Sequence, residues 1–204
     1  HGSPSFYAVL SLAGFIDERD LRTFKSDDTY LSAHPSMNLE KGIEFSSGSL
    51  GQGLSLGVGS ALALKHKRNE VPRVFVLLGD GECDEGQIWE AAMSASHHGV
   101  DNLVAIVDRN RIQNDRWTHE VMSLEPFADK WKSFGWHAME VDGHSVNELL
   151  SAFDTADKTK GRPSVIIANT LKGKGVSFME NNVDFHGKAP SPEELSKALE
   201  EIGE

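Results

Sequence analysis

The distribution of apolar and polar positions along the chain predicts alternating strands and helices. Two short apolar runs, residues 73–78 and 103–107, are typical of buried parallel strands. Between them, residues 85–96 carry apolar side chains at helical spacing on one face, with acidic side chains in the first turn. A strand, a helix and a second strand within ~35 residues make one βαβ unit.

The same periodicities predict further elements on both sides of this unit. Helices are expected at residues 4–14, 17–25, 53–68, 126–134, 146–158 and 192–202, and strands at 136–141 and 163–168. Residues 26–45, 114–125 and 172–188 are expected to be loops. No repeat or linker interrupts the alternation of strands and helices. We therefore expect one α/β domain over residues 1–204, a doubly wound, mostly parallel sheet with helices on both faces.

Local signals within these helices lead to two more specific predictions. Ser3 is the expected N-cap of the first helix, with Pro4 at the first helical position. Gly57 and Gly59 lie inside the helix at 53–68. Each glycine there costs ~1 kcal/mol relative to alanine, so we expect close backbone packing at both positions.

Composition and charge narrow the class of protein. The net charge of −11 argues against nucleic acid as a partner, because nucleic-acid binding requires a basic surface. No apolar run reaches the length of a membrane span, and no secretory signal is present. The single cysteine, Cys83, excludes an intramolecular disulfide and is consistent with the cytoplasm. Because the sequence begins at His1 and not at Met, we expect that the natural N-terminus is missing.

Two polar side chains follow the strands of the central βαβ unit. Asp80 follows the first strand and Asn110 follows the second. In open α/β sheets ligands bind at the carboxyl ends of the strands, so both side chains are expected at one crevice. Carboxylate and amide oxygens suit Mg²⁺, while Gly79 and Gly81 permit close backbone approach to a phosphate. The residues alone therefore predict a site for a metal and a diphosphate.

The wider sequence around these residues resembles a known family. Gly79-Asp80-Gly81 is followed by Asn110 about 28 residues after Gly81. This motif and spacing resemble the signature of thiamine-diphosphate-dependent enzymes. Residues 46–53 (SSGSLGQG) and 79–86 (GDGECDEG) are similar to sequence blocks of transketolases. Residues 171–175 (LKGKG), followed by His186-Gly187, are similar to a third block. Over its whole length the chain resembles the N-terminal, diphosphate-binding subunit of two-chain bacterial transketolases.

The resemblance implies a fold, cofactors and a partner. The fold would be the thiamine-diphosphate-binding fold, in its diphosphate-type domain, and the cofactors thiamine diphosphate and Mg²⁺, with Ca²⁺ or Mn²⁺ able to substitute. A pyrimidine-binding C-terminal subunit would complete the enzyme in an α2β2 assembly. The pair would transfer a two-carbon ketol unit from a ketose phosphate to an aldose phosphate, in the cytoplasm and the pentose phosphate pathway.

The resemblance also implies roles for individual residues. Asp80, Asn110 and the backbone carbonyl of Ile112 would bind the metal. The cofactor would contact Leu50, Gly51, Gly79, Asp80, Gly81, Glu82, Asn110 and His186. The catalytic set would be His1, His34, His186 and Glu85, with Glu85 joining a carboxylate network across the subunit interface.

Structural explanations remain open for this catalytic set. His34 and His186 could be ordinary loop residues, His1 could be a frayed terminus, and Glu85 could serve only the helix dipole.

Two departures from the family pattern are visible. Arg111 and Gln113 follow Asn110, where many relatives carry glycine and another residue. In the family a leading segment contains another histidine that faces the cofactor or substrate, and we expect that this segment is missing before His1.

Other functions remain compatible with the sequence. The same cofactor half could belong to an enzyme that acts on an unusual or sulfonated sugar, or that makes 1-deoxyxylulose phosphate. A non-catalytic interaction protein that has kept the fold is an alternative of another class. The donor and acceptor sugars are not determined by these residues, because the recognised blocks contact the cofactor.

Overall fold

The computed structural model describes residues 1–67 and 71–203. It divides into two compact units, His1–Leu50 and Gly51–Glu204, and each is described by itself. Arg68, the last residue of the helix predicted at 53–68, lies outside the described residues.

The first unit is built from short helices around a small apolar core. Its elements are α1 (Ser3–Leu12) and two 3-10 helices, η1 (Glu18–Thr23) and η2 (Leu39–Lys41). The buried side chains of this core are Tyr7, Leu10, Ile16, Leu31 and Ile43.

Two predictions for this unit were wrong in detail. Gly2, not Ser3, is the N-cap of α1, because the Ser3 hydroxyl donates to the carbonyl of Ala33 at 2.7 Å. The predicted helix at 17–25 is the 3-10 helix η1, whose N-cap Asp17 accepts a hydrogen bond from Arg19 N. No residue of η1 is fully buried, and Leu21 packs against the small core only partly buried, so little apolar contact would stabilise a longer α-helix.

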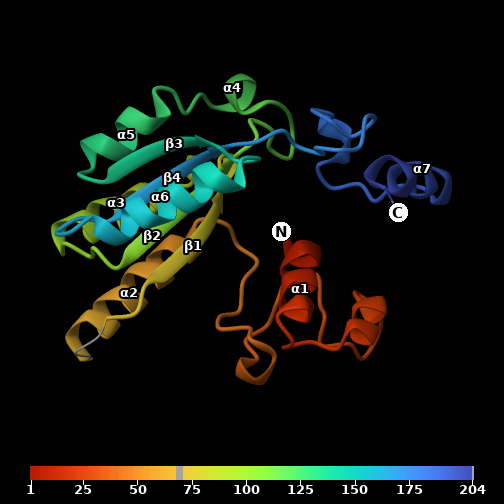
Figure 1. Cartoon of the computed structure of the whole chain (residues 1–204), viewed down its shortest axis with the longest axis horizontal. Helices are drawn as coiled ribbons and strands as arrows, with labels where there is room; N and C mark the ends of the chain where they lie inside the picture. The colour runs from red at the N-terminus through yellow and green to blue at the C-terminus, as the bar shows by residue number, and fades with distance from the viewer. Residues whose placement is uncertain (68–70, 204) are drawn as a thin grey trace. The chain divides into compact units, whose positions relative to one another are not determined.

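The second unit contains a four-stranded parallel sheet (Figure 1). The strands are β1 (Val74–Gly79), β2 (Leu103–Arg109), β3 (His137–Asp142) and β4 (Ser164–Asn169), in the order β1-β2-β4-β3. In this register Gly79 lies opposite Asp108, so β1 and β2 end at the same level. The predicted α/β fold is confirmed.

Helices cover both faces of this sheet. The longer helices around it are α2 (Gln52–Lys67), α3 (Gly86–His97), α5 (Phe127–Ser133) and α6 (Val146–Lys158). Residues of α2, α3 and α5 pack with the sheet in one buried cluster, and residues of α6 form a separate cluster with β2 and β4. Figure 1 shows α6 alone in front of the sheet. In this doubly wound arrangement α2, α3 and α5 cover one face of the sheet, and mainly α6 covers the other.

The remaining elements of this unit are shorter or lie near the C-terminus. They are η3 (Gly81–Asp84), α4 (Thr118–Val121), η4 (Val183–Phe185) and α7 (Pro192–Ile202), which begins with a capping box at Ser191. Within residues 1–67 and 71–203, no helix combines the length and the apolar character needed to cross a bilayer.

The prediction that both central strands are buried holds for β2 but not for β1. β1 is an edge strand, and the side chains of Phe75 and Leu77 are 55% and 72% exposed. Val76 and Leu78 point to the opposite, buried face. A continuous apolar run therefore did not distinguish an edge strand from a central one.

The start of α3 also differs from the prediction. No acidic residue lies in its first turn, because the chain first forms the 3-10 helix η3. Glu82 and Asp84 belong to η3, and Glu85 is the N-cap of α3 without a side-chain capping bond.

The two interior glycines of α2 meet different surroundings. A Cβ atom on Gly57 would lie 2.4 Å from a methyl carbon of Val76, so α2 approaches β1 closely at this point. A Cβ atom on Gly59 would meet nothing within 4 Å among the described residues. The prediction of close packing is confirmed at Gly57 and was wrong at Gly59.

We expect alanine to have opposite effects at these two positions. Gly57→Ala should destabilise the fold by ~1–3 kcal/mol, because Val76 is stiff and buried behind the new methyl group. Gly59→Ala should stabilise it by up to ~1 kcal/mol, through helix propensity alone. Urea unfolding of both variants measures the two changes, and equal effects would contradict the packing contact at Gly57.

Candidate active site

The two predicted ligand residues lie at the carboxyl ends of neighbouring strands. Asp80 directly follows β1 and is 2% exposed, and Asn110 directly follows β2 and is 8% exposed. Asp80 N donates a hydrogen bond to the carbonyl of Asp108 at 3.2 Å, which continues the pairing of β1 with β2. The parallel register therefore brings both residues to one edge of the sheet.

The Asp80 carboxylate is held by two backbone N–H groups. Its Oδ1 accepts from Gly81 N at 2.8 Å, and its Oδ2 accepts from Arg111 N at 2.6 Å. Arg111 has the left-handed φ of 65°, which an arginine adopts only when its surroundings require it. The loop that carries Asn110 and Ile112 is thus tied to Asp80.

The Asn110 side chain is oriented by two hydrogen bonds. Its Oδ1 accepts from Ile112 N at 3.0 Å, and its Nδ2 donates to Asp108 Oδ2 at 3.0 Å. Ile112 itself is buried, and it pairs with Trp117 in an isolated antiparallel bridge. The three predicted metal ligands therefore belong to one hydrogen-bonded assembly around the ends of β1 and β2.

The electrostatics of this assembly favour a cation. Burial raises the pKa of Asp80 to about 6, although the N–H groups of Arg111 and Gly81 act in the opposite direction. The charge of Asp108 raises this pKa further, and Arg109 lowers it. Since a buried carboxylate is costly without a positive partner, a bound divalent ion would relieve this cost.

The donor set suits Mg²⁺ more than a transition metal. A carboxylate, an amide and a backbone carbonyl are all oxygen donors, which a hard cation prefers. Within the described parts of the chain, no group of three or more His, Cys, Asp or Glu side chains could hold a metal. One carboxylate, with positions left for phosphate and water, is the usual arrangement for Mg²⁺ in phosphate sites.

Two glycines near these groups allow the backbone to pack closely. A Cβ atom on Gly81 would lie 2.6 Å from Cβ of Gln113, and one on Gly51 would lie 2.8 Å from Cβ of Glu85. Gly51 also has the left-handed φ of 83°. The backbone at both positions therefore comes closer to its neighbours than a side chain would permit.

Glu82 links the two glycine segments. Its carboxylate accepts from Gly51 N at 2.8 Å and from Gly79 N at 2.9 Å. Both oxygens thus hold the backbone at the start of α2 and at the end of β1. The structure accounts for Glu82 as a clamp between these loops, and its predicted contact with the cofactor stays a prediction.

In the first unit, the structure brings two predicted catalytic residues together. The ring centroids of His1 and His34 are 5.1 Å apart, and both residues are exposed. The ring of His34 lies over Gly48, where a Cβ atom would be 3.3 Å from it. Leu50 is 42% exposed at the end of this unit.

His186 and Glu85 are the remaining predicted catalytic residues. His186 follows η4, and its Nδ1 is buried with no hydrogen-bond partner among the described residues. Burial, followed by the charge of Lys172, lowers the pKa of His186. Its ring is therefore neutral at neutral pH. Glu85 is exposed, and its predicted role at a subunit interface stays a prediction.

Two residues of the assembly were missed from the sequence. The Asp108 carboxylate accepts hydrogen bonds from Asn110 Nδ2 and from the Thr170 hydroxyl. Asp108 lies two positions before Asn110 along the extended chain, so both side chains lie on the same face. This spacing was the sequence signal that could have identified Asp108. Thr170 follows β4, and nothing in the local sequence indicates its partner.

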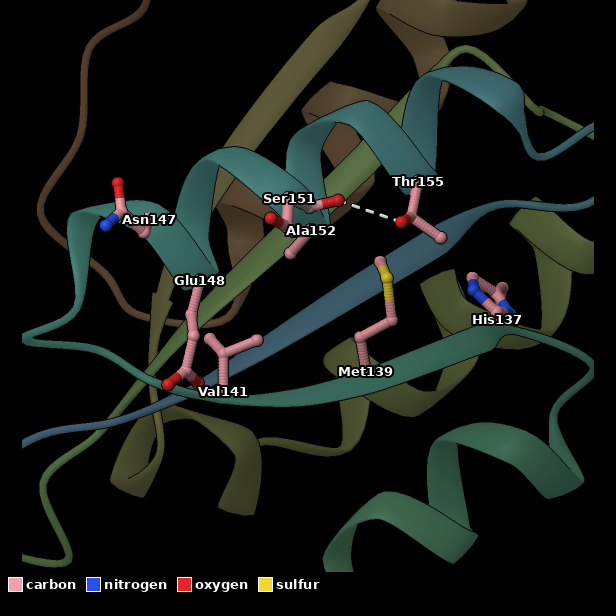
Figure 2. Close-up of a pocket in the computed structure, with 8 residues that line it drawn as sticks. All are labelled: His137, Met139, Val141, Asn147, Glu148, Ser151, Ala152 and Thr155. Atoms are coloured by element: carbon pink, nitrogen blue, oxygen red, sulfur yellow. Dashed lines mark hydrogen bonds between the residues drawn. The ribbon is translucent and has the colours of Figure 1, made fainter.

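A separate hollow lies along the outer strand of the sheet. Figure 2 shows it between β3 and α6, with Met139 and Val141 facing Ala152 and with His137 at one end. Its volume is about 540 Å³. None of the predicted site residues lines it, so it is distinct from the assembly around Asp80.

Comparison with known proteins decides the family. Residues 1–204 match the transketolase, thiamine diphosphate binding domain family. This chain belongs to the transketolase family. The chain is accordingly the N-terminal, thiamine diphosphate binding domain of a transketolase, which is a transferase.

Several transketolase relatives are similar over nearly the whole chain. A 6-deoxy-6-sulfo-D-fructose transketolase subunit of Clostridium sp. (strain MSTE9) is 43% identical over 99% of this chain and 73% of its own length. An apulose-4-phosphate transketolase subunit of Phocaeicola vulgatus is 41% identical over 100% of this chain and 72% of its own. Human transketolase is 39% identical over 98% of this chain and 31% of its own.

Solved transketolase structures share the fold. The transketolase of Campylobacter jejuni has a TM-score of 0.90 and 30% identity, over 97% of this chain and 32% of that one. The transketolase of Leishmania mexicana has a TM-score of 0.88 and 31% identity, over 97% of this chain and 31% of that one.

We expect the metal-free transketolase domain to lose stability as the pH rises through the pKa of Asp80. In the folded chain this pKa is raised to about 6, against ~3.9 in an unfolded chain. The neutral carboxyl therefore stabilises the fold below ~pH 4, and this contribution is lost as the pH rises through ~6. Two units of pKa correspond to roughly 3 kcal/mol.

Unfolding of the wild type and of Asp80→Asn, without metal and between ~pH 4 and 8, measures this effect. The difference between the two free energies of unfolding isolates Asp80 from the other titrating groups. As the pH rises, the wild type should lose stability relative to Asp80→Asn. A difference that does not depend on pH would show that Asp80 titrates normally.

Proposed function

We propose that this chain is the diphosphate-binding subunit of a two-subunit transketolase that binds thiamine diphosphate with Mg²⁺. The observation that carries the proposal is the pair of buried residues Asp80 and Asn110, which end neighbouring strands and are joined through Arg111 N. A buried carboxylate and an adjacent amide oxygen suit a hard cation that bridges to a diphosphate.

The residues that would hold the cofactor have separate tasks. Asp80, Asn110 and the carbonyl of Ile112 would hold Mg²⁺, with Ca²⁺ or Mn²⁺ able to replace it. The close backbone at Gly81 would admit the diphosphate, and Leu50 and Gly51 would lie against the cofactor ring. When bound, thiamine diphosphate supplies the nucleophilic carbon that accepts and releases the ketol unit.

Three histidines would handle protons near the substrate. His1 and His34 lie together and exposed, which suits groups that reach a ligand from outside. His186, neutral because its pKa is lowered, can accept a proton at neutral pH. These roles support a reaction in which proton transfer accompanies the cleavage and formation of a carbon–carbon bond between sugar phosphates.

A partner subunit would complete the site. The relatives from Clostridium and Phocaeicola are named as transketolase subunits. We infer that the partner is a pyrimidine-binding C-terminal subunit, that the assembly is α2β2, and that exposed Glu85 faces the partner. Because Cys83 is a free thiol, we place the enzyme in the cytoplasm, and because the net charge is −11, we expect no nucleic acid as a partner. We further propose, from its transketolase family, that it acts in the pentose phosphate pathway.

Removal of the Asp80 carboxylate should abolish Mg²⁺-dependent cofactor binding. We expect Asp80→Ala, assembled with the partner subunit, to show no binding of thiamine diphosphate in calorimetry with Mg²⁺ present. Asp129→Ala is the matched control, because Asp129 is exposed and pairs with Lys132 on the surface. Unchanged binding by Asp80→Ala would refute the assignment of this site.

The chain alone should transfer no ketol unit. We expect turnover of a ketose phosphate only after the partner subunit is added, because the partner would supply the surface that binds the pyrimidine ring of the cofactor. A coupled assay of the separate chains and of their mixture makes the comparison. Turnover by this chain, purified free of partner, would refute the two-subunit proposal.

A second candidate function keeps the cofactor and changes the sugar. The relatives named for 6-deoxy-6-sulfo-D-fructose and for apulose 4-phosphate are 43% and 41% identical, while human transketolase is 39% identical. These similar values do not distinguish the substrates. The reconstituted pair should be assayed on a panel containing ordinary ketose phosphates, apulose 4-phosphate and the sulfonated sugar. We expect the ordinary ketose phosphates to give the highest kcat/KM. A preference for apulose 4-phosphate or for the sulfonated sugar would establish the alternative.

A further inference from the structure

The carboxylate of Asp108 lies behind the metal-ligating end of Asn110. Its Oδ2 accepts from Asn110 Nδ2 at 3.0 Å, and its Oδ1 accepts from the Thr170 hydroxyl. Thr170 N in turn donates to the carbonyl of Arg109 at 3.2 Å. The ends of β2 and β4 are thereby joined through one acidic side chain.

Asp108 is also connected to β1. Its own carbonyl accepts from Asp80 N at 3.2 Å, and Gly79 lies opposite it in the sheet. A single residue therefore contacts the segments that carry both predicted side-chain ligands. Any shift of Asp108 would be transmitted to Asp80 and to Asn110.

The hydrogen bond to Asp108 decides which end of the Asn110 amide faces the ligand. A carboxylate can only accept, so the amide must present its NH₂ group to Asp108. The Oδ1 atom is then turned away, where it accepts from Ile112 N at 3.0 Å and keeps a second lone pair for a metal. Without Asp108 the amide could rotate and present the NH₂ group, which cannot bind a cation.

The charge of Asp108 acts in the same direction. A dication between the strand ends is attracted by the charges of both Asp80 and Asp108. An amide that donates to a carboxylate is also polarised toward its oxygen, which makes Oδ1 a better ligand.

We propose that Asp108 is a positioning residue for the metal: it turns Oδ1 of Asn110 toward Mg²⁺ and raises the affinity for Mg²⁺, while Thr170 holds Asp108 in place. The inference rests on the proposed function, because it concerns the same metal and cofactor.

Four substitutions separate the effect of the hydrogen bonds of Asp108 from the effect of its negative charge. Asp108→Asn keeps the shape and an acceptor for Asn110 but removes the charge, and Asp108→Ala removes both. Thr170→Val removes the hydroxyl donor, and Thr170→Ser keeps it. Each variant is assembled with the partner subunit, and Mg²⁺ is titrated by calorimetry at saturating thiamine diphosphate.

We expect Asp108→Ala to weaken Mg²⁺ binding by about 10–100-fold, as removal of an outer partner of a metal ligand does. Asp108→Asn and Thr170→Val should each have a smaller effect, and Thr170→Ser should bind like the wild type. Because the residue acts on binding, excess Mg²⁺ should restore kcat of Asp108→Ala to within about twofold of the wild type. Thermal unfolding of each apo variant identifies any general loss of structure.

Three results would overturn the proposal. The first is wild-type Mg²⁺ affinity in both Asp108 variants, measured beside Asp80→Ala as the variant that loses the site. The second is a loss of kcat that excess Mg²⁺ does not restore, which would indicate a purely structural role. The third is a wild-type assembly that binds no Mg²⁺ with thiamine diphosphate, and then the proposed function fails together with the inference. If Asp108→Ala does not fold, the Mg²⁺ affinity of Asp108→Asn in the same titration tests the proposal.

Discussion

The buried carboxylate of Asp80 is the constraint around which this transketolase domain is arranged. A charge at 2% exposure is costly unless something compensates it. Two backbone N–H groups provide part of the compensation, and they come from the segments that follow β1 and β2. The left-handed backbone of Arg111 accompanies the hydrogen bond from its N–H group to Asp80. The remaining compensation is what a bound cation would supply.

Close backbone approach is the second requirement of the site. α2 approaches β1 closely at Gly57, and η3 approaches Gln113 closely at Gly81, because neither glycine carries a Cβ atom. Glu82 then fixes the approach by accepting from the N–H groups of Gly51 and Gly79. The helix, the loop and the strand end are therefore positioned by hydrogen bonds to backbone groups, and a ligand with negative charge would meet glycine backbone instead of bulky side chains.

The chemistry of the described residues is divided between two tasks. The assembly around Asp80 supplies oxygen ligands and room for a diphosphate, and its ionisable groups are mainly carboxylates. The histidines that we propose for proton transfer are the pair His1 and His34 and the neutral His186. This division agrees with a proposed enzyme in which one subunit holds the charged end of the cofactor and a partner completes the surroundings of the reactive ring. Asp108 and Thr170 extend the first task, because they orient a ligand without contacting the metal.

The sequence by itself determined the βαβ unit, the α/β fold and the positions of Asp80 and Asn110, because these depend on local periodicity and on where each strand ends. It also determined the bounds of α6 and α7, whose polar and apolar positions alternate regularly. Only the tertiary structure decided that β1 is an edge strand, that Gly57 but not Gly59 is packed, and that Asp108 binds Thr170. These features depend on strand order and on contacts between residues far apart in the chain, 62 positions in the case of Asp108 and Thr170. A local pattern records which face of an element is apolar, but the partner that meets this face is chosen by the packing of the whole unit.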